Sequence, residues 1–161
     1  MKKERIFHTA RGYQMLNSEN KLLTPSMEDY LEMIYRVCLE EGYIRVNQLA
    51  ARLNVRPPSV TKVVKKLKNL GLVEYEKYGV VKLTEEGKEL GQFLLRRHGI
   101  IEEFLKKLGI EKTLLRDTEM IEHDVSINTL KSIHILNKFL DENPDVIKKY
   151  KKFKEKFRKD I

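Results

Sequence analysis

The sequence predicts a mainly α-helical protein in which a winged helix-turn-helix domain precedes a second, helical domain. Three observations support this fold class. Apolar residues recur at helical spacing through most of the chain, two helical segments meet at a proline-containing turn, and two short β-prone runs follow them directly. We therefore divide the 161 residues into an N-terminal extension over 1–23, a winged helix-turn-helix domain over 24–84 and a helical domain over 85–161.

The first helix is predicted to begin at Thr24 and Pro25 and to end at Gly42. Thr24 is a suitable N-cap, and proline is favoured at the first helical position. Apolar side chains at helical spacing, Leu31, Ile34, Tyr35 and Cys38, define its buried stripe. Cys38 is the only cysteine in the chain, so an intramolecular disulfide is excluded and core packing is the favoured interpretation of this thiol.

The next two helices are separated by a tight turn. Val46 to Leu53 has a helical apolar period, and Arg56-Pro57-Pro58-Ser59 interrupts it before a helix predicted over Pro58 to Leu70. Two β-prone runs, 72–76 and 80–83, then flank Lys77-Tyr78-Gly79, which is a hairpin of the size of a wing. This order of elements is typical of a winged helix-turn-helix module.

Three further helices are predicted in the second domain. Thr84 with the following glutamates begins a long helix that runs to Gly109 and is long enough for a dimer interface. Another is predicted over Thr118 to Leu140, bent or interrupted near 124–126, and a basic helix follows Pro144.

The charge balance favours a polyanionic partner. The formal net charge is +8 at pH 7, with lysines and arginines concentrated at both ends and along the second helix of the helix-turn-helix. No stretch approaches the length of a membrane span, and a single cysteine fits a reducing compartment. These features predict a cytoplasmic protein without a membrane partner.

The outward face of the Pro58 to Leu70 helix is basic and carries no carboxylate. If this helix enters the major groove of duplex DNA, its N-terminal end meets base edges, and its lysines meet phosphates. A solvated lysine face is the alternative for an isolated helix, but the neighbouring helix and hairpin favour DNA. The candidate DNA-binding residues are Arg56, Pro58, Ser59, Thr61, Lys62, Lys65 and Lys66, with Lys77 and Tyr78 at the hairpin.

Six acidic and histidine residues form a candidate metal site: Asp29, Glu32, His98, Glu119, Glu122 and His123. Spacings of three and four residues place Asp29 with Glu32, and Glu119 with Glu122 and His123, on common helix faces. Taken singly, each residue also fits helix capping, surface or packing. Four carboxylates gathered in one site repel strongly unless divalent cations are present, so we expect two ions per subunit. Oxygen-rich ligands without a thiolate suit Mn²⁺ and Fe²⁺, although Zn²⁺, Co²⁺ and Cu²⁺ also bind such ligands.

Five segments occur together in this order: Thr24 to Glu32, Pro58 to Lys62, Tyr75 to Tyr78, Arg97-His98 and Glu119 to His123. In this combination they resemble the diphtheria toxin repressor family, and within it the manganese transport regulator branch, from about residue 24 to about residue 145. This resemblance implies a homodimeric, metal-activated repressor of metal-uptake genes whose ligands occupy the six positions above. The iron-responsive branch has methionine at the position of Asp29 and cysteine at that of Glu119, so the resemblance favours manganese.

Two other functions are compatible with parts of this pattern. A carboxylate-bridged di-metal enzyme uses similar ligands, but the usual helical bundle has two Glu-x-x-His motifs, and no second copy accompanies Glu119 to His123. A winged-helix regulator that senses an organic ligand, or no ligand, would use the DNA face alone. The favoured interpretation is a repressor in which metal fixes the orientation of the recognition helices on operator DNA.

Overall fold

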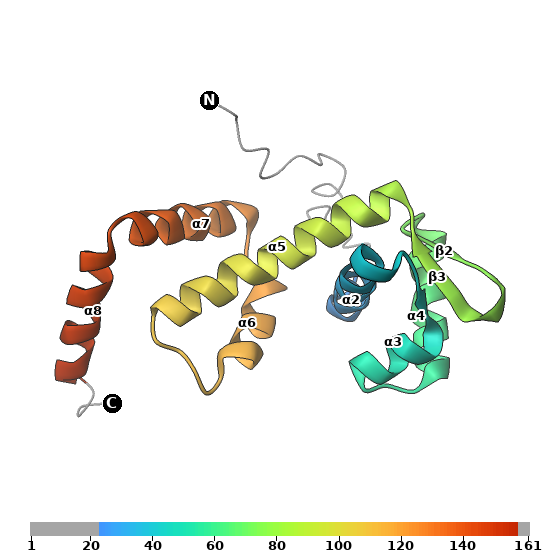
Figure 1. The fold of residues 1–161 in the computed structure, drawn as a ribbon, viewed down its shortest axis with the longest axis horizontal. Coiled ribbons are helices and arrows are strands. Elements are labelled where there is room, and N and C mark those ends of the chain that lie inside the picture. The colour runs from blue at the N-terminus through green and yellow to red at the C-terminus, as the bar shows by residue number, and fades with distance from the viewer. Residues whose placement is uncertain (1–22, 158–161) are drawn as a thin grey trace. The chain divides into compact units, whose positions relative to one another are not determined.

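The computed structural model describes residues 23–157, which fold into helices joined to a small antiparallel sheet (Figure 1). The chain divides into two compact units, one ending at Leu95 and one beginning at Arg96. Helix α5 (Glu85–Lys107) begins in the first unit and ends in the second. The predicted fold class is confirmed, and almost all of the predicted N-terminal extension lies outside the described residues.

Helix α2 (Pro25–Glu41) has the ends that its sequence predicts. The Thr24 side chain accepts a hydrogen bond from the backbone N–H of Met27 at 3.3 Å, and Pro25 is the first helical residue. Gly42 ends the helix at φ 79°, a left-handed conformation that glycine adopts without a steric penalty. The helix buries its apolar stripe and leaves Asp29 exposed.

Helices α3 (Val46–Leu53) and α4 (Pro57–Asn69) form the helix-turn-helix. Helix α4 begins one residue earlier than predicted, with Arg56 as its N-cap, because proline at the first position needs no hydrogen-bond acceptor. Val60, Val64 and Leu67 are fully buried and direct the opposite face of α4 outward. This packing determines which α4 side chains are available to a partner.

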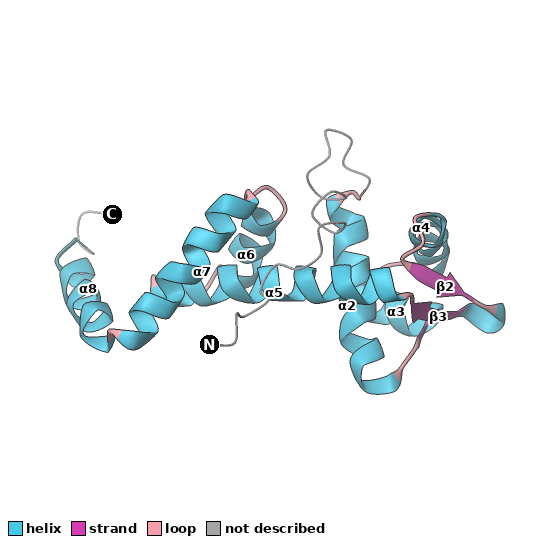
Figure 2. Cartoon of the chain, turned by 90° about the horizontal axis from the view of Figure 1, so that it is seen from above, coloured by secondary structure: helices cyan, strands magenta, loops and turns pink. Residues whose placement is uncertain are grey.

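The sheet consists of β1 (Ile44–Arg45), β2 (Val73–Tyr75) and β3 (Val80–Leu83), in the order β1-β3-β2. Both pairings are antiparallel, and a short 3₁₀ turn, η1 (Lys77–Gly79), joins β2 to β3 as the predicted wing (Figure 2). Strand β1 was not predicted, because a two-residue strand is too short for an alternating pattern. It connects the helix-turn-helix directly to the wing through Arg45↔Val80.

One apolar core unites the elements of the first unit. It includes fully buried side chains from α2, α3, α4, the sheet and the start of α5, among them Leu31, Leu49, Leu67, Val81 and Leu90. Cys38 is partly buried against this core, and burial raises the pKa of its thiol. Core packing was the predicted role of this residue.

The second unit contains the end of α5 followed by α6 (Leu114–Glu122), α7 (Ile127–Glu142) and α8 (Pro144–Phe157). The helix predicted over 118–140 is two helices, because Ser126 caps a new one: its side chain accepts from the backbone N–H of Thr129 at 3.2 Å. The interruption lies where it was expected, near 124–126, whereas the start at Leu114 is four residues earlier than predicted.

Three polar contacts join α5 to α7, and one of them is a hydrogen bond from Lys107 to the backbone carbonyl of Asn137 at 3.1 Å. The buried amide of Asn137 donates to the backbone carbonyl of Ile100 at 2.9 Å. Lys107 forms ion pairs with Glu103 and with Asp141, the latter at 2.9 Å. Burial alone would lower the pKa of Lys107, but the hydrogen bonds to Glu103 and Asp141 outweigh it and raise that pKa. The hydrogen bond from Lys107 lowers the pKa of Asp141.

Within residues 23–157, none of the helices combines the length and the apolar composition that crossing a bilayer requires.

Candidate metal centre and nucleic-acid interface

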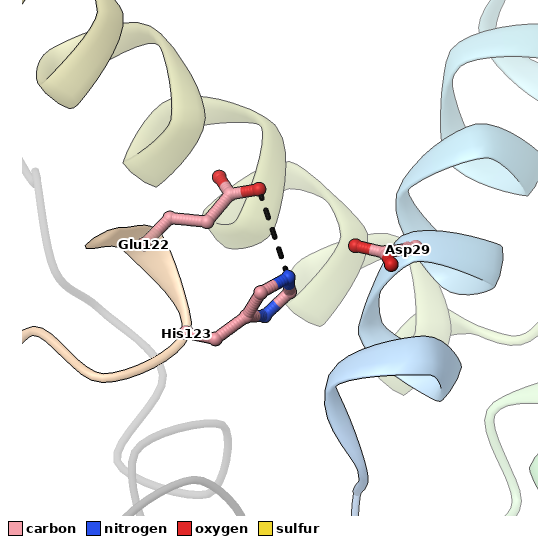
Figure 3. Close-up of side chains that lie close together, drawn as sticks. All are labelled: Asp29, Glu122 and His123. Carbon is pink, nitrogen blue, oxygen red and sulfur yellow. Dashed lines mark ion pairs between the residues drawn. The ribbon is translucent and has the colours of Figure 1, made fainter. Parts of the chain in front are cut away.

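The second unit brings three of the predicted metal ligands together. The Nδ1 atom of His98 lies 3.1 Å from Oε2 of Glu122, and Nε2 of His123 lies 3.9 Å from Oε1 of the same carboxylate. Figure 3 shows the Glu122 and His123 side chains with this second ion pair as a dashed line. Each oxygen of Glu122 therefore has an imidazole nitrogen beside it.

The middle of α5 and the C-terminal end of α6 position this cluster. His98 projects from α5, Glu122 is the last residue of α6, and His123 is its C-cap. Glu122 is only 1% exposed, and a carboxylate so deeply buried is costly unless cationic or hydrogen-bonding groups compensate it. A guanidinium nitrogen of the buried Arg97 approaches Nδ1 of His123 at 3.4 Å and orients the ring.

The remaining candidate ligands have different surroundings. In the first unit, Asp29 and Glu32 are three residues apart on α2, Asp29 exposed and Glu32 buried. The carboxylate of Glu32 accepts a hydrogen bond from Nε of Arg36 at 3.0 Å. Glu119 lies one turn before Glu122 on α6 and is exposed, and no hydrogen bond or ion pair among the described residues joins it to the His98–Glu122–His123 cluster.

The donor atoms fit a divalent cation. Imidazole nitrogens and carboxylate oxygens are ligands for Mn²⁺, Fe²⁺ and Zn²⁺, and the described cluster contains no thiolate. A cation between these groups would also compensate the buried charge of Glu122. The chemistry of the cluster thus agrees with the metal site predicted from the sequence.

The outer face of α4 is basic, as predicted. Ser59, Lys62, Lys65 and Lys66 are exposed, and α4 contains no acidic residue. Arg56 and Pro58 at the N-terminal end are also exposed, whereas Thr61 is half-buried and its hydroxyl donates to the Pro57 carbonyl at 3.2 Å. This surface attracts a polyanion and lies opposite the buried valines.

The wing adds Lys77 and Tyr78, and both are exposed. Tyr78 is 90% exposed, more than any other large apolar or aromatic side chain of residues 23–157. The structure also adds two residues that were not predicted, Arg45 and Asn47, which line a hollow between the wing and the start of α4. In the sequence, these two residues were marked only by their position: Arg45 directly precedes α3, and Asn47 lies in its first turn.

Comparison with protein families matches both parts of the chain. Residues 22–81 match the iron-dependent repressor N-terminal DNA-binding domain, and residues 84–151 match the iron-dependent repressor metal-binding and dimerisation domain. Both models are domains of iron-dependent repressors, which are DNA-binding transcriptional regulators and not enzymes, so the predicted non-enzymatic function is confirmed and the di-metal enzyme alternative is excluded.

Known relatives agree with this match. A protein of Lysinibacillus sphaericus named HTH-type transcriptional regulator MntR is 45% identical over 127 residues, which are 78% of this chain and 91% of the relative. Its Bacillus subtilis namesake is 43% identical over 123 residues, 76% and 87% of the two chains.

A solved structure, described as that of the manganese regulator SloR, is 34% identical with a TM-score of 0.62. The similarity covers 74% of this chain and 55% of SloR, so this chain spans about half the length of that protein. The chain belongs to the iron-dependent repressor family of metal-dependent, DNA-binding transcriptional regulators.

Proposed function

We propose that this repressor is activated by Mn²⁺ and binds operator DNA upstream of metal-uptake genes as a homodimer. The observation that carries the metal part is the buried Glu122 carboxylate with an imidazole on each side. The similarity to SloR, which is described as a manganese regulator, supports Mn²⁺ over Fe²⁺. The proposed ligands are Asp29, Glu32, His98, Glu119, Glu122 and His123, which hold two ions per subunit.

Glu122 is the best candidate for a bridging ligand. Its two oxygens face different histidines, so a single carboxylate serves both sides of the cluster. When bound, the ions supply the positive charge that cancels repulsion among the four carboxylates of the set. His98 and His123 contribute neutral nitrogen donors and add no further negative charge.

The proposed ligands come from both functional halves of the chain. Asp29 and Glu32 belong to the DNA-binding half, 24–84, and the other four belong to the metal-binding and dimerisation half, 85–161. Ligands from both halves at one site restrict the orientation of each half relative to the other. In the dimer, this restriction keeps the two α4 helices about one turn of DNA apart, roughly 34 Å.

We assign the exposed face of α4 to the major groove. Arg56, Ser59 and Lys62 meet base edges or adjoining phosphates at its N-terminal end, where Pro58 and Thr61 also lie. Lys65 and Lys66 supply attraction that does not depend on base sequence, as do Lys77 and Tyr78 at the wing. The absence of acidic residues from α4 supports this assignment.

The test compares Glu122→Ala and Asp29→Ala with the wild type and with Glu40→Ala, an exposed acidic residue on the same helix as Asp29. Mn²⁺ stoichiometry and operator affinity are measured for each protein, with circular dichroism to verify folding. Glu122→Ala is expected to lose both Mn²⁺ binding and Mn²⁺-dependent operator binding. Asp29→Ala is expected to lose more of the activation than of the metal affinity, because four ligands of the other half remain.

Glu40→Ala is expected to behave as the wild type. The proposed site is wrong if Glu122→Ala and Asp29→Ala both retain wild-type Mn²⁺ stoichiometry and Mn²⁺-dependent operator affinity.

A further inference from the structure

A hollow of about 410 Å³ lies between the wing and the helix-turn-helix. Its walls come from three places: Arg45 and Asn47 at the start of α3, Pro58 and Thr61 at the start of α4, and Tyr78 at the wing tip, together with their neighbours. All of these belong to the first unit. The hollow therefore adjoins the end of α4 that we assign to DNA.

Arg45 gives this hollow a positive charge. Its backbone N–H donates to the Gln48 side chain at 2.9 Å, and one guanidinium nitrogen donates to the carbonyl of Tyr78 at 3.3 Å. Within residues 23–157 no carboxylate forms an ion pair with Arg45, and the residue is exposed. Most of the five guanidinium N–H donors therefore remain available to an anion.

Tyr78 has an unusual backbone conformation at the wing tip. Its φ is 62° and its ψ is 22°, in the left-handed region that disfavours side chains other than those of glycine, asparagine and aspartate. Gly79 follows at φ 73°, so two successive residues are left-handed. The hydrogen bond from Arg45 connects this turn to the end of β1. The turn leaves the Tyr78 ring exposed to solvent.

A strained backbone that presents an exposed aromatic ring beside an arginine without an ion pair to any described carboxylate indicates a binding function rather than a packing one. The adjoining basic face of α4 selects duplex DNA as the partner, because a phosphodiester strand offers an anion for the guanidinium and a sugar for the ring. Apart from Arg45, none of the lining residues carries a charge, so no negative charge from the lining opposes a phosphate.

We propose that Arg45 and Tyr78 form a clamp for one phosphate–sugar unit of the operator backbone. Arg45 binds a phosphate oxygen and, through the Tyr78 carbonyl, keeps the wing tip in place, while the Tyr78 ring packs on the adjoining sugar. The clamp rests on the proposed DNA face of α4. Its contacts are independent of base sequence, so they add equal affinity for operator and for unrelated duplexes.

The first test uses Arg45→Gln, which removes the charge but keeps an amide donor, and Arg45→Lys, which keeps the charge. With saturating Mn²⁺, Arg45→Gln is expected to weaken binding to operator and to unrelated duplex alike, by about fivefold to tenfold at 0.1 M salt, and to reduce the log–log salt slope by about 0.9. Arg45→Lys is expected to keep the salt slope. Arg52→Gln, an exposed arginine that does not line the hollow, is the control.

The second test distinguishes the contribution of the Tyr78 ring to DNA affinity from that of the backbone conformation at this position. Tyr78→Asn keeps a residue that tolerates the left-handed conformation and removes the ring. Affinity is expected to fall by about threefold to tenfold at an unchanged salt slope, with no loss of thermal stability, whereas Tyr78→Phe binds as the wild type.

The outcomes separate the clamp from the function on which it rests. If Arg45→Gln lowers affinity but leaves the salt slope unchanged, Arg45 does not bind phosphate and the clamp is overturned. If Arg45→Gln and Tyr78→Asn both bind as wild type while Lys65→Ala weakens binding, the clamp is wrong and the α4 face stands. If Lys65→Ala also has no effect, the DNA face itself is wrong.

Discussion

The two units of the chain bury their apolar side chains to very different degrees. Of the 23 buried apolar residues among those described, 19 belong to the first unit and four to the second. Conversely, ten of the 14 exposed large apolar side chains belong to the second unit, on α6, α7 and α8. The first unit buries most of its apolar side chains within its own fold, whereas the second leaves an apolar surface that a partner can cover.

This difference matches the functions of the two family domains: the first binds DNA, and the second binds metal and forms the dimer. An apolar surface left exposed on α7 and α8 is suited to a second copy of the same chain, since homodimer interfaces resemble protein cores. A DNA-binding module instead needs a rigid core and a polar outer face. Helix α4 has both features, because one side is buried and apolar and the other is exposed and basic. Four sets of substitutions test this difference between the two units.

The largest effect is expected from a cavity in the core of the first unit. Leu67→Ala removes a fully buried side chain of α4 and should lower the free energy of unfolding by about 2–5 kcal/mol. Phe153→Ala on α8 removes a side chain that is 58% exposed and should change the stability of the monomer by less than about 0.5 kcal/mol. Urea unfolding at low protein concentration measures both, and equal losses would contradict the proposed difference between the units.

A charge on the apolar surface of the second unit should disrupt the proposed homodimer. Phe139 is 50% exposed on α7, and loss of an interface anchor typically costs about 2 kcal/mol or more, roughly 30-fold in affinity. Phe139→Glu is therefore expected to raise the dimer dissociation constant by at least about 30-fold in sedimentation experiments. Leu39→Glu, which changes an exposed leucine of the first unit, should leave the dimer intact. A reversed pattern would place the interface on the first unit.

The DNA face offers a smaller effect that is specific to the first unit. Lys65→Ala or Lys66→Ala should weaken binding to every duplex and reduce the log–log salt slope by about 0.9 for each lost phosphate contact. Lys62→Ala, nearer the N-terminus of α4, should instead change the preference among bases. Fluorescence anisotropy over a range of salt concentrations distinguishes these results, and three unchanged slopes and preferences would remove α4 from the interface.

The smallest effect is a pH dependence confined to the second unit. Lys107 lowers the pKa of Asp141 in the folded state. The pair therefore stabilises the folded state at pH values above the pKa of an unfolded Asp, about 3.9. This stabilisation is lost as the pH falls through the pKa that Asp141 has in the folded state. Asp141→Asn should therefore lower the melting temperature slightly at pH 6 and not at pH 2. An equal decrease at both values would mean that the ion pair is not the cause.

Periodicity and capping signals predicted most of this fold. The ends of α2 followed from Thr24, Pro25 and Gly42, and the wing followed from two β-prone runs around Lys77 to Gly79. Strand β1 has two residues and therefore no pattern, so its link to the wing, and with it the role of Arg45, became visible only in three dimensions.

For the metal site, spacings of three and four residues predicted that Glu119, Glu122 and His123 project from one helix face. Glu122 and His123 do lie close together, at 3.9 Å, but no hydrogen bond or ion pair among the described residues joins Glu119 to them. The approach of His98 to Glu122 joins residues 24 positions apart, and only the packing of α5 against α6 creates it. Spacing was also a poor guide to burial: Glu119 and Glu122 are on the same helix, yet one is exposed and the other is almost fully buried. Tertiary contacts determine such differences.

We propose that metal and operator stabilise the same arrangement of the two halves. Thermodynamic linkage then requires Mn²⁺ to bind more tightly when operator is present, by the same factor by which Mn²⁺ strengthens operator binding. Calorimetric titration of Mn²⁺ into the protein, alone and with a saturating operator duplex, measures this directly. We expect a gain of about fivefold or more with operator and no gain with Asp29→Ala. Equal Mn²⁺ affinity with and without operator would contradict the proposed coupling.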